Sequence, residues 1–192
     1  MIENQESNIV EIAIYGRGGQ GAITASSLLC EIAFEEGYKD VLDIPMIGAE
    51  RRGAPVQAYA KLSKLYEIKN FCSVTNQQYS LIFDHTLLKL KNIVSTFRGI
   101  IIINAPKRIN LESLNQFKEV WIVDATNISI KHNLLIAGFP ILNTLMLGAF
   151  ARVSNQFSLE SLKKVLYERF GKTNGERNYI ASKEAYDSVK RI

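Results

Sequence analysis

The residues best suited to chemistry form a glycine-rich loop near the start of the sequence. The loop reads Gly16-Arg17-Gly18-Gly19-Gln20-Gly21, between an apolar segment over residues 9–15 and an amphipathic segment over residues 22–36. Glycine lets the backbone turn tightly and approach a phosphate, while a helix that follows offers unpaired N–H groups and the positive end of its dipole. The pattern favours a nicotinamide or flavin dinucleotide, because Asp40 and Asp43 stand near the usual position of a ribose-binding acid. Alternatively, the glycines serve only tight packing or contact with a partner chain.

A second loop carries two adjacent arginines. Arg51 and Arg52 lie between Gly48 and Gly53, where a dinucleotide-binding fold would have its next helix. Guanidinium groups bind carboxylates and phosphates through paired hydrogen bonds. Two interpretations stay open: a surface loop with an ion pair from Glu50 to an arginine, or a second anion-binding loop beside the first.

The sequence contains no self-sufficient set of catalytic residues. His85 and His132 are far apart, and the motifs GxSxG, P-loop, HExxH and the thiamine-binding GDG are missing. Cys30 and Cys72 are too few for a four-thiolate cluster, and we expect both to be buried, reduced thiols. These features favour a subunit that contacts a cofactor within a larger enzyme.

The elements that must position these loops alternate between strands and helices. Strands are predicted over residues 9–15, 41–44, 55–62, 81–83, 100–103 and 120–123, with a further strand over 66–74. Helices are predicted over residues 22–36, 86–91, 111–117, 142–152, 159–170 and 179–189. This order predicts an α/β fold over residues 1–192 as one domain, with three layers. A largely parallel sheet carries helices on both faces, and the first strand–glycine loop–helix unit is Rossmann-like.

Composition excludes several classes of protein. The 192 residues are 47% hydrophobic and 22% charged, which is ordinary for a globular protein. Residues 1–50 carry a net charge of −7 and residues 51–192 a net charge of +11, but the basic residues are scattered, so we expect no nucleic-acid partner. Pro140 and Asn143 interrupt the most apolar stretch, so we expect no membrane span. The start lacks the pattern of a secretory signal, which predicts a cytoplasmic protein.

The two loops taken together resemble those of a known family. Residues 16–22 followed by Gly48-Ala49-Glu50-Arg51-Arg52-Gly53-Ala54-Pro55-Val56 are similar to the gamma subunit of 2-oxoacid:ferredoxin oxidoreductases. The similarity runs nearly end to end, with further matching segments over residues 84–88, 98–104, 140–149 and 175–178. The second loop looks like the pyruvate type. Many members of the wider family have Arg-Gly-Gly where this chain has Arg52-Gly53-Ala54, which argues against the 2-oxoglutarate type and favours pyruvate or a branched 2-oxoacid.

This resemblance implies a function that the residues alone do not. The family's complex decarboxylates a 2-oxoacid, such as pyruvate, on thiamine diphosphate. It passes electrons through 4Fe–4S clusters to ferredoxin and transfers the acyl group to coenzyme A. Thiamine diphosphate and the clusters are implied for alpha, beta and delta-type partner subunits, and a contribution to coenzyme A binding for this chain. A stand-alone dinucleotide-binding oxidoreductase and a non-catalytic scaffold subunit are the alternatives.

The residue-level expectations follow from the two loops. The predicted cofactor-binding residues are Gly16, Arg17, Gly18, Gly19, Gln20, Gly21, Arg51, Arg52 and Gly53. No catalytic or metal-binding residue is predicted in this chain. We expect the isolated chain to be inactive, and to be stable only with partners or to self-associate. The segment from Gly138 to Phe150 is the predicted interface, although core burial is the more common fate of such residues.

Overall fold

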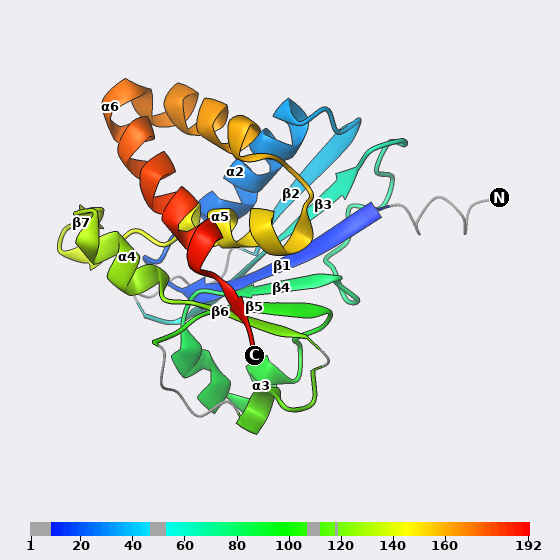
Figure 1. Cartoon of the computed structure of the whole chain (residues 1–192). Coiled ribbons are helices and arrows are strands. Elements are labelled where there is room, and N and C mark those ends of the chain that lie inside the picture. The colour runs from blue at the N-terminus through cyan, green and yellow to red at the C-terminus, as the bar shows by residue number, and fades with distance from the viewer. Residues whose placement is uncertain (1–8, 47–52, 107–111, 118) are drawn as a thin grey trace.

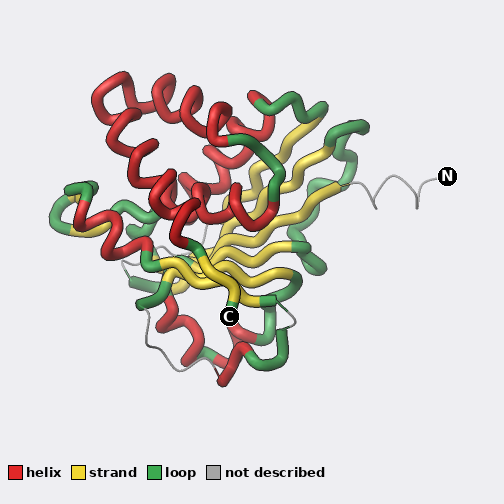
Figure 2. The backbone as a smooth tube through the Cα atoms, viewed as in Figure 1, coloured by secondary structure: helices red, strands yellow, loops and turns green. Residues whose placement is uncertain are grey.

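A twisted sheet with helices on both faces forms the computed structural model of the chain (Figures 1 and 2). The structure describes residues 9–46, 53–106, 112–117 and 119–192. Within these residues the sheet has seven strands in the order β2-β3-β1-β4-β5-β6-β9. Their bounds are β1 (Ile9–Arg17), β2 (Asp40–Met46), β3 (Pro55–Ser63), β4 (Tyr79–Ile82), β5 (Ile100–Asn104), β6 (Val120–Val123) and β9 (Lys190–Arg191). The predicted α/β fold class is confirmed.

The strand order differs from a simple Rossmann unit beside the first strand. β1 pairs with β4 in parallel, and β4, β5 and β6 continue in parallel. On its other side β1 pairs with β3 in an antiparallel register, and β2 pairs only with β3. The second strand of the sequence is therefore separated from the first by the returning third strand.

One face of the sheet carries the larger layer of helices. These are α2 (Ala22–Glu35), α4 (Ala125–Lys131), α5 (Asn143–Ser154) and α6 (Leu159–Ser188). Figure 1 shows α2, α5 and α6 on this side. Alternation along β1 explains the packing, because Ile12 and Ile14 face this layer whereas Ala13 and Tyr15 face the other. At Gly148 of α5 a Cβ atom would lie 2.1 Å from the carbonyl oxygen of Ser182, so only glycine permits this close helix crossing.

The opposite face carries a thinner layer of short helices. These are the 3-10 helices η1 (His85–Lys89) and η2 (Glu112–Leu114) and the single-turn α3 (Lys91–Val94). Phe97, fully buried, contacts Tyr15 of β1 edge-on, with ring centroids 4.7 Å apart. β5 is buried on both faces, as its unbroken isoleucine run predicts.

Several predicted elements were wrong or incomplete. Residues 66–74 form no strand, because β3 already has strand partners on both sides and this segment crosses from β3 toward β4. It is held instead by Asp40, which accepts from the N–H of Ile68, and by Lys61, which donates to the carbonyl of Asn70. The two predicted C-terminal helices follow each other directly as α6. A kink at Gly171, whose φ is 73°, separates its two parts.

Other elements carried a weaker sequence signal. The predicted helix over 111–117 is only η2 within the described residues. We did not predict α4 or the hairpin of β7 (Leu135–Ile136) and β8 (Phe139–Pro140).

Cys30 is buried as predicted, but Cys72 is exposed on the crossing segment, so the expectation of two buried thiols was wrong. In the described part of the chain, no helix is both long and apolar enough to cross a membrane.

Candidate functional site

The glycine loop joins the end of β1 to the start of α2. Gly19 and Gly21 have φ values of 94° and 81°, a region that residues with a side chain seldom adopt. Gly21 is the N-cap of α2, and no side chain in the described part of the chain caps the first turn of that helix. Among the described residues, a Cβ atom at Gly19 would meet nothing within 4 Å, so these residues leave the space above this glycine open. Anion binding at this loop stays a prediction, and an open approach to the backbone is the geometry that it requires.

Backbone hydrogen bonds join the glycine loop to the start of the second loop. The N–H of Gly18 donates to the carbonyl of Ala54 at 2.9 Å, and the N–H of Gly53 donates to the carbonyl of Gly18 at 3.3 Å. The N–H of Gln20 donates to the carbonyl of Arg17 at 3.0 Å. Two of the N–H groups in the predicted anion site, those of Gly18 and Gln20, are thus used inside the chain.

Arg17 extends from the loop toward the end of β4. Its Nη1 donates to the carbonyl of Gly53 at 2.9 Å. Its Nε and Nη2 donate to Oγ1 of Thr86 at 3.1 and 2.8 Å, and Nε lies 3.2 Å from Oδ2 of Asp84. The side chain is 28% exposed, so this guanidinium group is largely committed to contacts within the chain.

Asp84 follows β4 and receives donors from several segments. Its Oδ1 accepts from the N–H of Thr86 at 2.8 Å and from the Thr86 hydroxyl at 2.6 Å. Its Oδ2 accepts from Nε2 of Gln20 at 3.0 Å. Burial raises the pKa of Asp84, but the hydrogen bonds from Thr86 and Gln20 and the charge of Arg17 outweigh it, so the pKa lies below its ordinary value.

The structure places the predicted site residues unevenly. Residues 16–21 and Gly53 form one continuous region at the carboxyl ends of β1 and β4. Arg51 and Arg52, with the proposed Glu50 pair, lie outside the described residues. We missed Asp84 and Thr86, as well as Asn143, whose amide nitrogen would lie 3.2 Å from a Cβ atom at Gly21. The signal available was an apolar strand that ends in aspartate.

The expected ribose-binding acids do not belong to this region. Asp43 accepts from the Ser26 hydroxyl of α2 at 2.5 Å, and Asp40 binds the N–H groups of Val41 and Ile68. Burial raises the pKa of Asp43, although the Ser26 hydrogen bond opposes this. The interpretation was wrong because β3 lies between β1 and β2 and moves both carboxylates away from the glycine loop.

Other reactive residues serve structural roles. His132 contacts Oε2 of Glu184 at 2.7 Å through Nε2. Hydrogen bonds from Lys131 and His132 hold the pKa of Glu184 below its ordinary value. Burial raises the pKa of Cys30 to about 12, which keeps this thiol protonated. Among the described residues, no group of three or more His, Cys, Asp or Glu could hold a metal ion.

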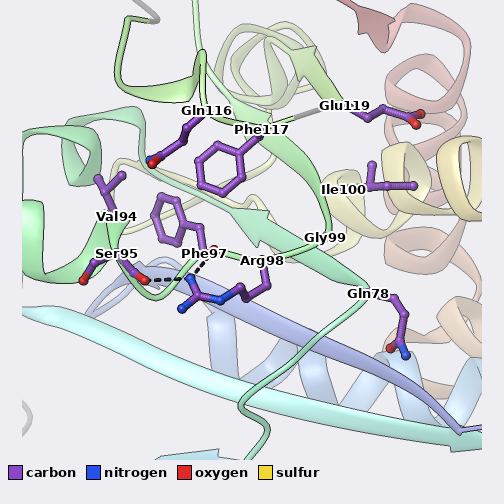
Figure 3. Close-up of a pocket in the computed structure, with 10 residues that line it drawn as sticks. All are labelled: Gln78, Val94, Ser95, Phe97, Arg98, Gly99, Ile100, Gln116, Phe117 and Glu119. Atoms are coloured by element: carbon purple, nitrogen blue, oxygen red, sulfur yellow. Dashed lines mark hydrogen bonds between the residues drawn. The ribbon is translucent and has the colours of Figure 1, made fainter. Parts of the chain in front are cut away.

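A hollow of about 670 Å³ opens at the other end of the sheet (Figure 3). Its walls include Gln78 before β4, Gly99 before β5 and Glu119 before β6, so it lies at the amino ends of these strands. Nη1 of Arg98 donates to the carbonyls of Ser95 and Phe97, which holds the guanidinium group against its own loop. The hollow is therefore separate from the glycine loop.

The predicted interface, Gly138–Phe150, is mostly buried, and the exposed apolar side chains lie largely just before it. Most of α5 is buried in the core, because its faces pack on both α6 and the sheet, so residues 143–150 are unsuited to a partner. The preceding hairpin and α4 instead expose apolar side chains, with Ile136 at 68% and Ile130 at 52%. Within the predicted segment Phe139 of the hairpin is exposed, at 54%, and the adjoining exposed apolar surface lies on α4 and β7, which precede that segment.

Together, the fold and the loop define an α/β domain in which a glycine loop joins the first strand of a mixed sheet to a helix. Comparison with known proteins then identifies the family. Residues 11–188 match the model of the pyruvate ferredoxin/flavodoxin oxidoreductase family, and the chain belongs to that family. The resemblance noted in the sequence is confirmed.

The similar proteins agree in extent with this chain. A pyruvate synthase subunit PorC from Methanocaldococcus jannaschii is 37% identical over 94% of this chain and 97% of its own. The common gamma subunit of the pyruvate/ketoisovalerate oxidoreductases of Pyrococcus furiosus is 37% identical over 95% and 98%. The crystal structure of the pyruvate oxidoreductase subunit PORC from Thermotoga maritima matches with a TM-score of 0.82 at 31% identity, over 96% and 98%.

A more distant structure shows the same fold in a longer chain. The 2-oxoglutarate:ferredoxin oxidoreductase from Magnetococcus marinus matches with a TM-score of 0.75 at 16% identity. The match covers 94% of this chain but 31% of that chain. The fold therefore occurs both as a separate subunit and within a larger polypeptide.

Proposed function

We propose that this chain is the gamma subunit of a multi-subunit 2-oxoacid:ferredoxin oxidoreductase, with pyruvate as the 2-oxoacid. The observation that carries the proposal is the match over nearly the whole of both chains to PorC subunits of pyruvate synthase. The complex oxidatively decarboxylates the 2-oxoacid to an acyl-CoA and passes the electrons to ferredoxin. Because the Pyrococcus furiosus relative is common to pyruvate and ketoisovalerate oxidoreductases, a branched 2-oxoacid is the other substrate to test.

The composition of the chain supports a division of labour between subunits. A 4Fe–4S cluster needs four ligands, usually cysteine thiolates, whereas this chain has two cysteines in all. The sequence also lacks the GDG segment of thiamine-dependent enzymes. Thiamine diphosphate and the clusters therefore belong to alpha, beta and delta-type subunits of the same complex.

The glycine loop and the arginine loop form the proposed contact with coenzyme A. Coenzyme A carries a pyrophosphate and a 3′-phosphate, and both suit backbone N–H groups and arginine side chains. The open space above Gly19 and the uncapped start of α2 fit a phosphate. The structure of the Magnetococcus marinus enzyme was determined with coenzyme A and succinyl-CoA bound. Arg51 or Arg52 would supply the charged contacts beside Gly53.

Kinetics of the assembled complex test this contact. Arg52→Ala should raise the KM for coenzyme A by about ten- to a hundredfold, because a hydrogen bond to a charged group contributes about 1.5–3 kcal/mol. The KM for the 2-oxoacid should stay unchanged. Arg98→Ala, at the opposite end of the sheet, is the matched control and should change neither value. Loss of assembly, with normal coenzyme A kinetics in the remaining complex, would mean that the arginine binds a neighbouring subunit instead.

We further propose the α4–hairpin surface, which includes Ile130 and Ile136, as a contact with another subunit. Exposed apolar side chains gain most from burial at such contacts. Ile136→Asp should abolish co-purification with the other subunits while leaving the helical circular dichroism of the isolated chain intact. Phe34→Asp is the matched control, since Phe34 is equally exposed, at 68%, but lies on α2. Equal loss of assembly in both variants would reject this surface.

Activity of the isolated chain distinguishes the proposed subunit from a stand-alone oxidoreductase. Purified alone, it should contain no iron or thiamine diphosphate and should not oxidise pyruvate with coenzyme A and an artificial electron acceptor. Turnover by this chain alone would overturn the proposal. Identification of the co-purifying chains would separate a catalytic complex from a scaffold role.

A further inference from the structure

A network of four side chains lies beneath the glycine loop at the ends of β1 and β4. Asp84 stands at its centre and is 15% exposed, and both of its oxygens accept hydrogen bonds. The donors come from η1, through Thr86, and from the glycine loop, through Arg17 and Gln20. One partly buried carboxylate thus connects two segments that are more than sixty residues apart in the sequence.

Arg17 and Gln20 carry these contacts onward to both loops. Nη1 of Arg17 donates to the carbonyl of Gly53, where the second loop enters the described structure. Oε1 of Gln20 accepts from the N–H of Arg17 at 2.8 Å, which closes the glycine loop on itself. The network therefore restrains the glycine loop from below and sets its position relative to Gly53.

We propose that Asp84 is a positioning residue for the anion site, and that Arg17 and Gln20 act through it rather than on the ligand. This inference rests on the proposed coenzyme A contact of the glycine loop. A loop already held in its binding conformation loses less conformational freedom when the ligand binds. Among the described residues, no side chain of the network caps the first turn of α2 or closes the space above Gly19.

The Asp84→Asn variant of the assembled complex tests the role of the charge. Asparagine keeps an oxygen for the cap of η1 but loses the charge that attracts Arg17. Its N–H₂ group would also face a donor where the carboxylate oxygen now accepts a hydrogen bond. Hydrogen exchange should become faster in a peptide that spans residues 17–24. The KM for coenzyme A should rise about tenfold, which corresponds to the loss of one charged contact, while the KM for the 2-oxoacid stays unchanged.

Asp124→Asn is the matched control. Asp124 also follows a parallel strand and caps a helix, but among the described residues its side chain accepts hydrogen bonds only from the backbone and side-chain nitrogens of Asn127. A general cost of losing a cap would therefore appear in both variants, whereas the change over residues 17–24 and in coenzyme A kinetics should appear only with Asp84→Asn. Equal behaviour of the two variants would overturn the proposal.

The two readouts separate this proposal from the coenzyme A assignment itself. Unchanged exchange over residues 17–24 in Asp84→Asn would refute the positioning role. Faster exchange with an unchanged KM for coenzyme A would retain the positioning of the loop and overturn coenzyme A as its ligand. Arg52→Ala would then also leave coenzyme A kinetics unchanged.

A milder variant covers the case in which Asp84→Asn does not assemble. Thr86→Val removes the hydroxyl that accepts from Arg17 and donates to Asp84 but keeps the backbone N–H cap. It should change exchange and KM in the same direction, by about threefold in KM. No change in either measurement would count against the network.

Discussion

Two strand ends of this sheet have the same local sequence pattern but different roles. β4 is followed by Asp84, which caps η1, and β6 is followed by Asp124, which caps α4. Asp84 lies beside β1 and so reaches the glycine loop. Asp124 is two strands further along the sheet and, within the described residues, hydrogen-bonds only to its own helix. The comparison shows that strand order, rather than the aspartate or its capping of a helix, brings Asp84 into contact with the glycine loop.

Asn104 at the end of β5 joins the two strand ends. Its Nδ2 donates to the carbonyl of Phe83 and to Oγ1 of Thr126, both at 2.9 Å. Its Oδ1 accepts from the N–H of Thr126 at 3.2 Å. Because Phe83 precedes Asp84 and Thr126 follows Asp124, this buried amide couples the two regions.

The largest effect is expected from breaking this link. Asn104→Ala removes the side-chain partner of the fully buried Phe83 carbonyl and of the half-buried Thr126 N–H, so the free energy of unfolding should fall by about 3 kcal/mol. Urea denaturation of the chain measures this change. Asn127→Ala, which removes an exposed amide at the Asp124 end alone, should cost less than about 1 kcal/mol. A similar cost for both variants would contradict the link.

The next largest effect concerns the glycine-loop end. Arg17→Ala removes four contacts with Gly53, Thr86 and Asp84, and it should lower the free energy of unfolding by about 2 kcal/mol. Arg98→Ala is the control, since Arg98 also donates to two backbone carbonyls but lies exposed at the other end of the sheet. Arg98→Ala should cost about 0.5 kcal/mol. Denaturant midpoints compare the two arginines directly.

Acid should weaken the Asp84 end in a specific range of pH. The pKa of Asp84 is lowered in the folded chain, so its stabilising contribution is complete above the unfolded pKa of about 3.9. The contribution disappears as pH falls through the lower, folded pKa. The difference in unfolding free energy between the wild-type chain and Asp84→Asn should therefore be constant from pH 7 to pH 5 and shrink below about pH 4. A constant difference down to pH 2 would show that the carboxylate charge does not stabilise this end.

The smallest effect is expected at the Asp124 end. Asp124→Asn keeps a good capping residue on α4, so the free energy of unfolding should fall by about 0.5 kcal/mol or less. Asp124→Ala, which removes the cap, should cost about 1 kcal/mol. Thermal denaturation of the two variants measures how much the helix cap alone contributes to the free energy of unfolding. The additional contacts of Asp84 can then be assessed against that contribution. A cost of Asp124→Asn as large as that of Asp84→Asn would remove the distinction between the two ends.

Much of the fold was predictable because local patterns decide it. The buried strands β5 and β6 and the unit of β1, glycine loop and α2 were all predicted to within two residues at each end. Helix α4 was missed because its seven residues contain two β-branched isoleucines and a threonine, which give little helical signal. Segment 66–74 was misjudged because its β-forming residues lie where no strand can accept them.

The sequence by itself determined which residues carry the family resemblance and which loop is the candidate for anion binding. Two cysteines, the missing thiamine motif and the glycine loop are properties of residue type and spacing, and these also carry the family resemblance. Only the tertiary structure decided that Asp40 and Asp43 lie away from the loop and that Asp84 lies beneath it. The physical reason is that sheet pairing is non-local. The antiparallel return of β3 on one side of β1 and the parallel pairing of β4 on the other determine which side chains reach the glycine loop.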